Sequence, residues 1–223
     1  QSFKSKLIDL KPNKNNFSKN IFLNKTVLIN DNNWKQFINT SKIEIDKSFI
    51  ITSREALELK NLPDSIGIIG AGAIGVEFAY LFNAYGVDVT LFEAQNHLVP
   101  NEDESISKEL EKIFSAKGIK FELGAKVSNT TINSSNIDVE YDLNNEKKKY
   151  SADKLLVAVG VQANTDNLGL EMAGVELDGN FIKINDSMQT SVNNIYAVGD
   201  ITGKLMLAHV AFTQGVIAAE KIS

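Results

Sequence analysis

Three glycines stand at the spacing G-x-G-x-x-G in the run Gly70, Ala71, Gly72, Ala73, Ile74, Gly75. Between a strand and a helix, the first glycine of such a run permits a tight turn, and the second lets the backbone approach a pyrophosphate closely. The third lets the helix pack against the strand. The helix N-terminus offers free N–H groups and about half a positive charge to the phosphates. The run therefore predicts a dinucleotide-binding turn, which continues into Val76 and Glu77.

An acidic residue stands where a dinucleotide site needs one. Glu93 lies 18 residues after Gly75, close to the spacing of about 20 that is typical of such sites. Its carboxylate can accept hydrogen bonds from an adenosine ribose, whereas a 2′-phosphate in the same place would meet a like charge. Even at an effective dielectric constant near 20, that repulsion is on the order of several kcal/mol. No arginine follows in Ala94-Gln95-Asn96, so Glu93 predicts a preference for NAD(H) over NADP(H).

A second group of residues that could bind a ligand lies near the end of the sequence. The apolar run 195–198 leads into Gly199 and Asp200, and a helix is expected from about Leu207. A strand that delivers an acid at its carboxyl end, followed by a helix N-terminus, is a second ligand-binding geometry. A loop in which the aspartate only caps a helix explains the same residues, and both interpretations stay open.

The residues around the glycine run predict one βαβ unit. A buried strand over 66–69 precedes the run, and the helix after it has apolar residues at steps of four and three. Gly86 supplies a left-handed stop for this helix. A strand over 87–92 completes the unit, which should be right-handed with parallel strands. The helix residues expected on one buried face are Ile74, Phe78, Leu81 and Tyr85.

Further along, the sequence predicts a helix at about 104–117 and then an antiparallel meander instead of a second helical crossover. Asn144-Asn145 is expected to form the turn between the last two strands of the meander. The segment 155–159 is apolar throughout, as a strand covered on both faces should be. The expected strands of the meander are 119–123, 126–131, 137–141 and 148–151, and a further strand is expected at 194–198.

The first part of the sequence is less regular. Residues 1–61 are rich in Asn, Lys and Ser and predict short strands at 26–29 and 49–51, joined by polar loops. Thr52 and Glu55 have the spacing of a capping box, which predicts a short helix that ends before Pro63. A loosely ordered lead-in explains the same composition.

Composition argues against several classes of function. With a net charge of −5, the chain has no broad positive field for nucleic acid, and Lys147-Lys148-Lys149 is expected to be a solvated strand edge. The 223 residues contain no cysteine and only His97 and His209 as histidines, which argues against disulfides and metal sites. No apolar run approaches the roughly 18 residues of a membrane span, and no signal peptide is evident. We therefore expect a cytoplasmic or organelle-matrix protein.

Four motifs carry a resemblance to a known family. They are Gly-Ala-Gly-Ala-Ile-Gly-Val-Glu at 70–77, Leu-Leu-Val-Ala-Val-Gly at 155–160, Ile-Tyr-Ala-Val-Gly-Asp at 195–200, and Met-Leu-Ala-His-Val-Ala at 206–211 followed by Gln214-Gly215. In order and spacing the chain resembles the flavoprotein disulfide reductases, which are class I pyridine nucleotide-disulfide oxidoreductases, across about residues 48–223. The Met-Leu-Ala-His form and the acid at Glu93 resemble the branch that oxidises dihydrolipoamide, because glutathione-type reductases usually carry arginines instead of that acid.

The resemblance implies a fold and a division into domains. The fold is α/β: a Rossmann-like FAD/NAD(P)-binding domain whose parallel sheet has an antiparallel β-meander as crossover, plus a partial second nucleotide-binding domain. Residues 1–62 would form the N-terminal side of the FAD domain, 63–184 the NAD-binding domain, and 185–223 the return segment of the FAD domain. The family's Ala-Thr-Gly turn against the flavin should fall near 28–35, where this sequence departs from it.

Site residues carried over from the family fall into two groups. On the NAD side, Glu93, Val127 and Gly160 match contacts to the dinucleotide, although Gly160 is also explained as a simple turn glycine. Glu77 is either a surface helix residue or points toward the nicotinamide. On the FAD side, Asp200 would bind the ribityl hydroxyls. The residues that would lie against the flavin ring are Met206, Leu207, Ala208 and His209. Nothing suggests that His209 is an acid or base.

The resemblance also implies parts that this sequence lacks. The family's redox-active disulfide and its His-Glu pair are absent, so we expect an internal part of a longer protein, without a catalytic residue and inactive alone. The parent would be a homodimer that serves a 2-oxo acid dehydrogenase complex through a dihydrolipoamide-bearing protein. Alternatives are a mercuric reductase or NADH oxidase built on the same module, and a shortened, non-catalytic dinucleotide-binding protein.

Overall fold

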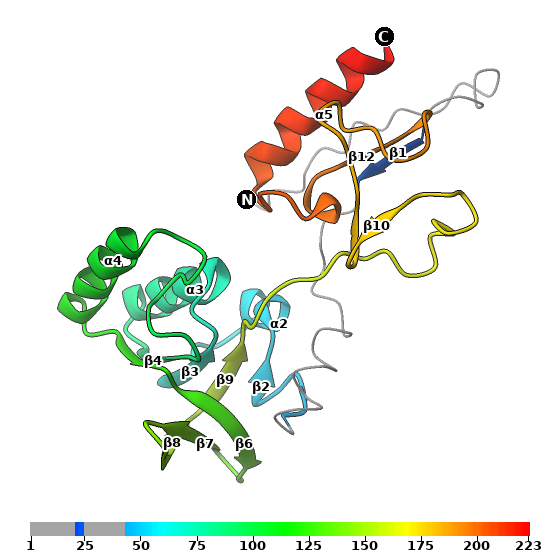
Figure 1. Ribbon diagram of the computed structural model, residues 1–223. Helices are drawn as coiled ribbons and strands as arrows, with labels where there is room; N and C mark the ends of the chain where they lie inside the picture. Colours follow the sequence, from blue (N-terminus) through cyan, green and yellow to red (C-terminus); the bar gives the residue numbers. More distant parts are fainter. Residues whose placement is uncertain (1–20, 25–42) are drawn as a thin grey trace. The chain divides into compact units, whose positions relative to one another are not determined.

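The computed structural model describes residues 21–24 and 43–223, which form two compact units. Residues 43–161 form the first, which we call the Rossmann unit. Residues 21–24 and 162–223 form the second, which we call the flanking unit because its segments lie on both sides of the Rossmann unit in the sequence (Figure 1). The chain thus divides at 161/162, not at the boundary expected after residue 184.

A five-stranded parallel sheet is the centre of the Rossmann unit, with the strand order β2-β9-β3-β4-β5. Its strands are β2 (Ile50–Ile51), β3 (Ser65–Ile69), β4 (Asp88–Glu93), β5 (Lys120–Leu123) and β9 (Lys154–Val157). Helix α3 (Ala73–Ala84) connects β3 to β4, and Gly86 after it has a positive φ of 85°. The expected βαβ unit is therefore present, with its left-handed glycine stop.

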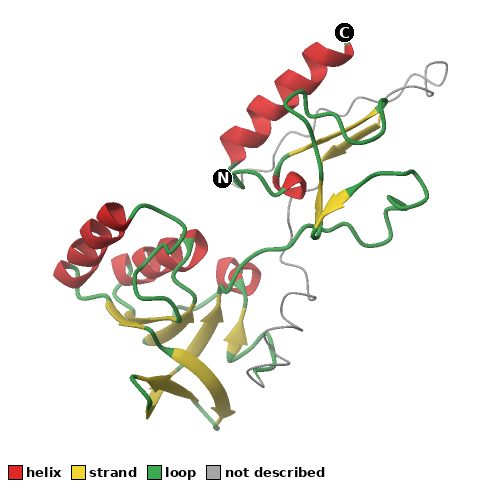
Figure 2. Ribbon diagram, viewed as in Figure 1, coloured by secondary structure: helices red, strands yellow, loops and turns green. Residues whose placement is uncertain are grey.

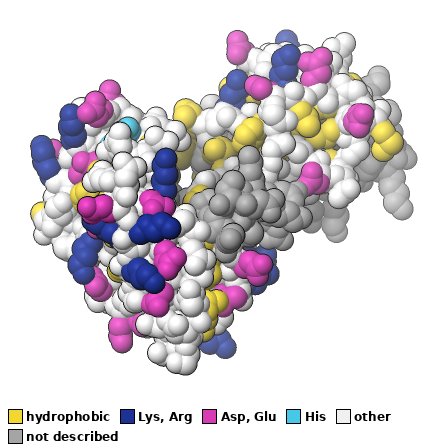
Figure 3. Space-filling view, turned by 60° about the horizontal axis from the view of Figure 1, so that its bottom comes forward, with side chains coloured by type: hydrophobic (Ala, Val, Ile, Leu, Met, Phe, Trp, Pro, Cys, Tyr) yellow, Lys and Arg dark blue, Asp and Glu magenta, His cyan; other side chains and the backbone are white. Residues whose placement is uncertain are grey.

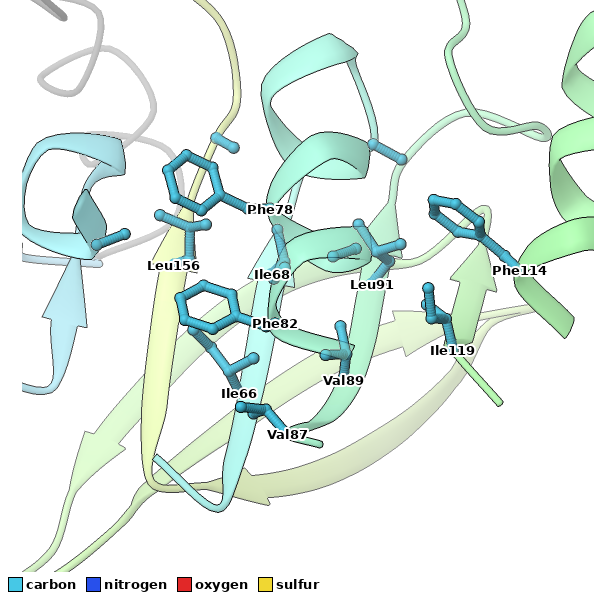
Figure 4. Close-up of a cluster of buried hydrophobic side chains, with 14 of the residues drawn as sticks. Ile66, Ile68, Phe78, Phe82, Val87, Val89, Leu91, Phe114, Ile119 and Leu156 are labelled. Atoms are coloured by element: carbon cyan, nitrogen blue, oxygen red, sulfur yellow. The ribbon is translucent and has the colours of Figure 1, made fainter. Parts of the chain in front are cut away.

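The face that α3 buries differs from the expected one. Leu81 and Tyr85 are 42% and 68% exposed, so the expected stripe is wrong at its C-terminal half. Figure 4 shows Phe78 and Phe82 of α3 over the apolar side chains of the sheet. Small residues on the buried face let the helix approach the sheet closely, and this decides which face packs. The buried residues of α3 are Gly75, Phe78, Ala79 and Phe82.

The antiparallel meander is confirmed for its last three expected strands, whereas the first, expected at 119–123, is β5 and pairs in parallel with β4 in the main sheet. The meander consists of β6 (Lys126–Ile132), β7 (Ile137–Leu143) and β8 (Glu146–Ala152), and it follows α4 (Glu104–Ala116) and β5 (Figure 2). Alternate residues of β7 are buried, as a strand covered on one face requires. Asn144 and Asn145 both have positive φ and form the predicted turn between β7 and β8.

The basic run lies on β8, which is an edge strand of the meander. Lys149 pairs with Glu140 of the neighbouring strand at 2.9 Å, and both side chains reach solvent. Figure 3 shows acidic and basic side chains interspersed over the visible surface. The interpretation of Lys147-Lys148-Lys149 as a solvated strand edge is therefore confirmed.

The Rossmann unit begins earlier than the expected boundary between residues 62 and 63. Helix α2 (Ser53–Leu57) begins with the predicted capping box, in which Thr52 and Glu55 bond each other's backbone and side chain. However, β2 pairs with β9 inside the parallel sheet. Residues 50–57 therefore belong to the same unit as the parallel sheet, although the NAD-binding domain was expected to begin only at residue 63. The buried apolar pair Ile50-Ile51 forms the edge strand of that sheet.

The flanking unit brings together segments from far apart in the sequence. Strand β1 (Ile21–Asn24) pairs in parallel with β12 (Ile195–Val198), with the whole Rossmann unit between them in the sequence. The expected strand at 26–29 lies outside the described residues. The unit also contains the hairpin β10 (Leu177–Asp178) and β11 (Phe181–Ile182), the 3-10 helix η1 (Asp200–Thr202) and the long helix α5 (Ala208–Ile222).

Candidate dinucleotide-binding site

The glycine turn connects β3 to α3 at the carboxyl edge of the sheet. Gly70 has a φ of 95°, and a Cβ there would lie 2.5 Å from the carbonyl oxygen of Ala158. A Cβ on Gly75 would lie 1.9 Å from the carbonyl oxygen of Gly70. Both positions therefore exclude side chains for steric reasons: Gly70 lies against the backbone that follows β9, and the first turn of α3 lies directly on the glycine turn at Gly75.

The middle glycine is different because a Cβ on Gly72 would meet no atom within 4 Å. Gly72 is the N-cap of α3, and no side chain caps the helix there. The N–H groups of the first helical turn have no partner within the helix. An open approach to uncapped N–H groups is what a pyrophosphate requires, so the residues present fit such a group.

Glu93 ends β4 beside this turn. Its side chain is buried at 7% exposure. Oε2 accepts a hydrogen bond from the N–H of Ala71 at 2.7 Å, and Oε1 accepts one from the N–H of Gln95 at 2.8 Å. Each carboxylate oxygen has a second lone pair, so the group retains acceptor capacity for a ribose hydroxyl.

Two more of the predicted NAD-side residues lie in the same unit. Gly160 follows β9, has a φ of 131° and leaves open space where its Cβ would be. Because β9 neighbours β3, Gly160 follows the carboxyl end of its strand at the same sheet edge as the glycine turn. Val127 lies near the start of β6 and packs against the aromatic cluster of Phe92 and Tyr141. The N–H of Ala125, just before β6, bonds the carbonyl of Glu93 at 2.8 Å.

The helix residues after the turn have different surroundings. Ile74 and Val76 are partly buried and pack against the core, whereas Glu77 is exposed. Glu77 lines a shallow, largely apolar groove between α3 and α4, together with Tyr80 and Leu110. Its exposure suits both interpretations of Glu77, so its role stays a prediction.

In the flanking unit, β12 delivers Gly199 and Asp200 as predicted, and α5 begins at Ala208 with Leu207 as its N-cap. Asp200 is the first residue of η1, whose cap is Gly199 without a side-chain bond. The interpretation of Asp200 as a simple cap therefore lacks support. Burial raises the pKa of its carboxyl, because a partly desolvated carboxylate is less stable than the neutral acid.

The residues expected at a flavin ring are all exposed, and they form the segment that enters α5. They are Met206, Leu207, Ala208 and His209. The carbonyl of His209 accepts a bond from the Thr213 hydroxyl at 3.1 Å, inside the helix. No side chain caps the N-terminus of α5.

Sequence reasoning missed Gln214 as an individual residue. It is 6% exposed, and its Oε1 accepts a bond from the N–H of Gly199 at 2.6 Å. The only signal in the sequence was its membership in the motif 206–215, which says nothing about its partner.

Among residues 21–24 and 43–223, no group of three or more His, Cys, Asp or Glu side chains is arranged to hold a metal ion. Within the same described residues, no helix is both long and apolar enough to cross a membrane.

The parallel sheet, the glycine turn and the acid beside it define a protein of the dinucleotide-binding α/β class. More particularly, the chain belongs to the pyridine nucleotide-disulphide oxidoreductase family, whose sequence profile matches residues 33–215.

Curated relatives and solved structures show which members of this family the chain resembles. It is 48% identical over 175 residues to a dihydrolipoyl dehydrogenase of Mycobacterium leprae, covering 78% of this chain and 38% of that protein. The dihydrolipoyl dehydrogenase of Bacillus subtilis is 43% identical over 180 residues, covering 80% and 38%. The flavoprotein disulfide reductase RclA of Escherichia coli superimposes with a TM-score of 0.75 at 27% identity, covering 91% of this chain and 44% of that one. The chain thus spans 38% of the length of these curated relatives.

Proposed function

We propose that this chain provides the NAD(H)-binding portion, and part of the FAD site, of a dihydrolipoyl dehydrogenase. The observation that carries the proposal is the open Gly72 turn with Glu93 beside it, in a chain 48% identical to such an enzyme. FAD and NAD(H) are the cofactors of the dihydrolipoyl dehydrogenases in this family. When bound, they supply the hydride transfer that carries electrons from a dithiol to NAD⁺.

In this proposal the Rossmann unit binds and orients the dinucleotide. The N–H groups at the start of α3 hold the pyrophosphate, which reaches them because Gly72 presents no Cβ. The Glu93 carboxylate accepts hydrogen bonds from the adenosine ribose and repels a 2′-phosphate. Gly160 and Val127 contact the dinucleotide along the sheet edge, and Glu77 lies at its nicotinamide end.

The flanking unit contributes to the flavin site. The Asp200 carboxylate accepts hydrogen bonds from the ribityl hydroxyls of FAD. The uncapped N-terminus of α5 presents its partial positive charge to the flavin ring, against which Met206 and Leu207 pack.

For the whole protein we propose a homodimer that oxidises a dihydrolipoamide-bearing partner within a 2-oxo acid dehydrogenase complex. The 223 residues contain no cysteine, so the chain by itself is not expected to oxidise a dithiol.

Titration of NADH and NADPH into the 223-residue chain, followed by nucleotide fluorescence, tests the nucleotide assignment. We expect NADH to bind at least about tenfold more tightly, since the Glu93 carboxylate repels the 2′-phosphate. Equal affinities of the unmodified chain for both nucleotides would contradict the role of Glu93, and failure to bind either would contradict the proposed function.

A further inference from the structure

Both oxygens of the Glu93 carboxylate are bonded to backbone N–H groups of the protein itself. Ala71 donates to Oε2 from the glycine turn, and Gln95 donates to Oε1 from the loop after β4, at 2.7 and 2.8 Å. Hydrogen bonds to an ionised acceptor are shorter and stronger than those between neutral groups. The carboxylate therefore connects the glycine turn to the end of the neighbouring strand through bonds within the protein alone.

The Ala71 bond belongs to a set that fixes the turn from one side. Gly70 donates its N–H to the carbonyl of Phe92 at 2.8 Å, and the carbonyl of Ala71 accepts the N–H of Val99 at 2.8 Å. Gly70 and Ala71 are thus anchored to β4 and to the loop that follows it. In this set Glu93 supplies the side-chain bond, whereas the other two join backbone to backbone.

The bond to Ala71 lies next to the proposed phosphate site, so its loss would change the geometry of that site. Ala71 immediately precedes Gly72, the N-cap of α3. If Ala71 lost its acceptor, a buried N–H group would be left unpaired, and the peptide would rotate to find another partner. Such a rotation would turn the first N–H groups of α3 away from the direction in which Gly72 leaves open space.

We propose that Glu93 is a positioning residue for the phosphate-binding turn, separately from its contact with the ribose. The proposal rests on the proposed function, because it concerns the same dinucleotide site. It follows that neutralising Glu93 weakens binding of NADH and NADPH together, and does not simply admit NADPH.

Two variants of the 223-residue chain separate positioning from charge. Glu93→Gln keeps the length of the side chain but offers an amide NH₂ where one N–H donor needs an acceptor. Glu93→Asp keeps the charge but is one methylene shorter, so it can bond Gln95 two residues on and not Ala71 as well. Glu109→Gln, an exposed acid-to-amide change in the same unit, is the control.

The first readout is amide hydrogen exchange at Ala71 in the cofactor-free protein, with Ile119, which bonds Phe114 at 3.0 Å, as the internal reference. The second is the dissociation constant of each nucleotide. For both Glu93 variants we expect exchange at Ala71 to accelerate about tenfold or more relative to Ile119. We also expect NADH binding to weaken about tenfold or more, without a gain for NADPH.

Each other outcome overturns the proposal. An unchanged Ala71 rate with weaker NADH binding would leave Glu93 as a ribose ligand alone. A faster Ala71 rate with unchanged affinity would show that the bond is irrelevant to the nucleotide, and equal acceleration at Ile119 would indicate general loss of stability. If the unmodified chain binds no nucleotide, the proposed function fails, while an unchanged exchange rate at Ala71 would separately overturn the positioning role.

Discussion

Gln214 and Gly199 form a buried hydrogen bond in which the glycine N–H donates to the glutamine Oε1 at 2.6 Å. Gly199 has a φ of 83° and a ψ of −160°, a conformation open essentially to glycine. Thr202 donates its hydroxyl to the carbonyl of the same glycine at 2.8 Å. The turn that presents Asp200 is therefore held by α5 on one side and by η1 on the other.

Replacing Gln214 by leucine should destabilise the flanking unit. Leucine fills a similar volume but leaves the Gly199 N–H buried without its acceptor, which costs about 1–3 kcal/mol. Urea unfolding of the chain measures the change. Thr213→Val, on the exposed side of the same helix, should change the free energy of unfolding by less than about 0.5 kcal/mol. Equal effects of the two substitutions would contradict the importance of the Gly199 bond.

Gly75→Ala should disrupt the Rossmann unit. The new Cβ would lie 1.9 Å from the Gly70 carbonyl oxygen, and the backbone must shift to relieve the overlap, at about 3 kcal/mol or more. Thermal unfolding measures the effect. Gly215→Ala in α5 is the control, since its Cβ meets nothing within 4 Å and a helical alanine should add about 0.5–1 kcal/mol. A wild-type melting temperature for Gly75→Ala would show that the close contact is not required.

Gly72→Ala should separate folding from binding. Gly72 has a φ of −72°, which alanine adopts freely, and its Cβ would enter open space. We expect a melting temperature close to that of the unmodified chain, because no protein atom is displaced. The affinity for NADH should fall about tenfold or more, because the methyl group occupies the approach to the N–H groups. Undiminished binding would place the pyrophosphate elsewhere.

Asp200→Asn should stabilise the cofactor-free protein at neutral pH. Burial raises the pKa of Asp200 above its ordinary value of 3.8, so ionisation costs more in the folded than in the unfolded state. That cost is present at neutral pH and disappears as the pH falls through the raised pKa and below 3.8, where both states are protonated. Unfolding free energies measured across this range should therefore converge with those of the unmodified chain at low pH.

The exposed Asp178→Asn is the matched control and should show no such trend. A stabilisation by Asp200→Asn that persists below 3.8 would contradict its origin in the carboxyl group.

Local signals in the sequence predicted much of the Rossmann unit. The glycine run, the stop at Gly86 and the turn at Asn144-Asn145 each encode a backbone conformation, and each has the expected geometry. The strand expected at 137–141 is likewise present as β7. These features depend on residues only a few positions apart, so their neighbours in the chain suffice to specify them.

Features that depend on distant partners were not predicted. The residues Ile50-Ile51 do not by themselves reveal that they pair with β9. The NAD-binding domain was therefore expected to begin too late in the sequence, at residue 63. The face of α3 depends on how closely Gly75 and Ala79 approach the sheet, which apolar spacing alone does not show. The bonds of Glu93 to Ala71 and of Gln214 to Gly199 join residues 22 and 15 positions apart, across elements whose orientation only the fold determines.

The parallel pairing of β1 with β12 has a consequence for the order of events during synthesis. The two strands lie on either side of the Rossmann unit in the sequence, so β1 leaves the ribosome long before its partner exists. At roughly 5–20 residues per second, that delay is on the order of ten seconds or more. A unit with its own sheet and core has time to fold in this interval. The nascent chain must therefore keep β1 from pairing with other strands until β12 has been made.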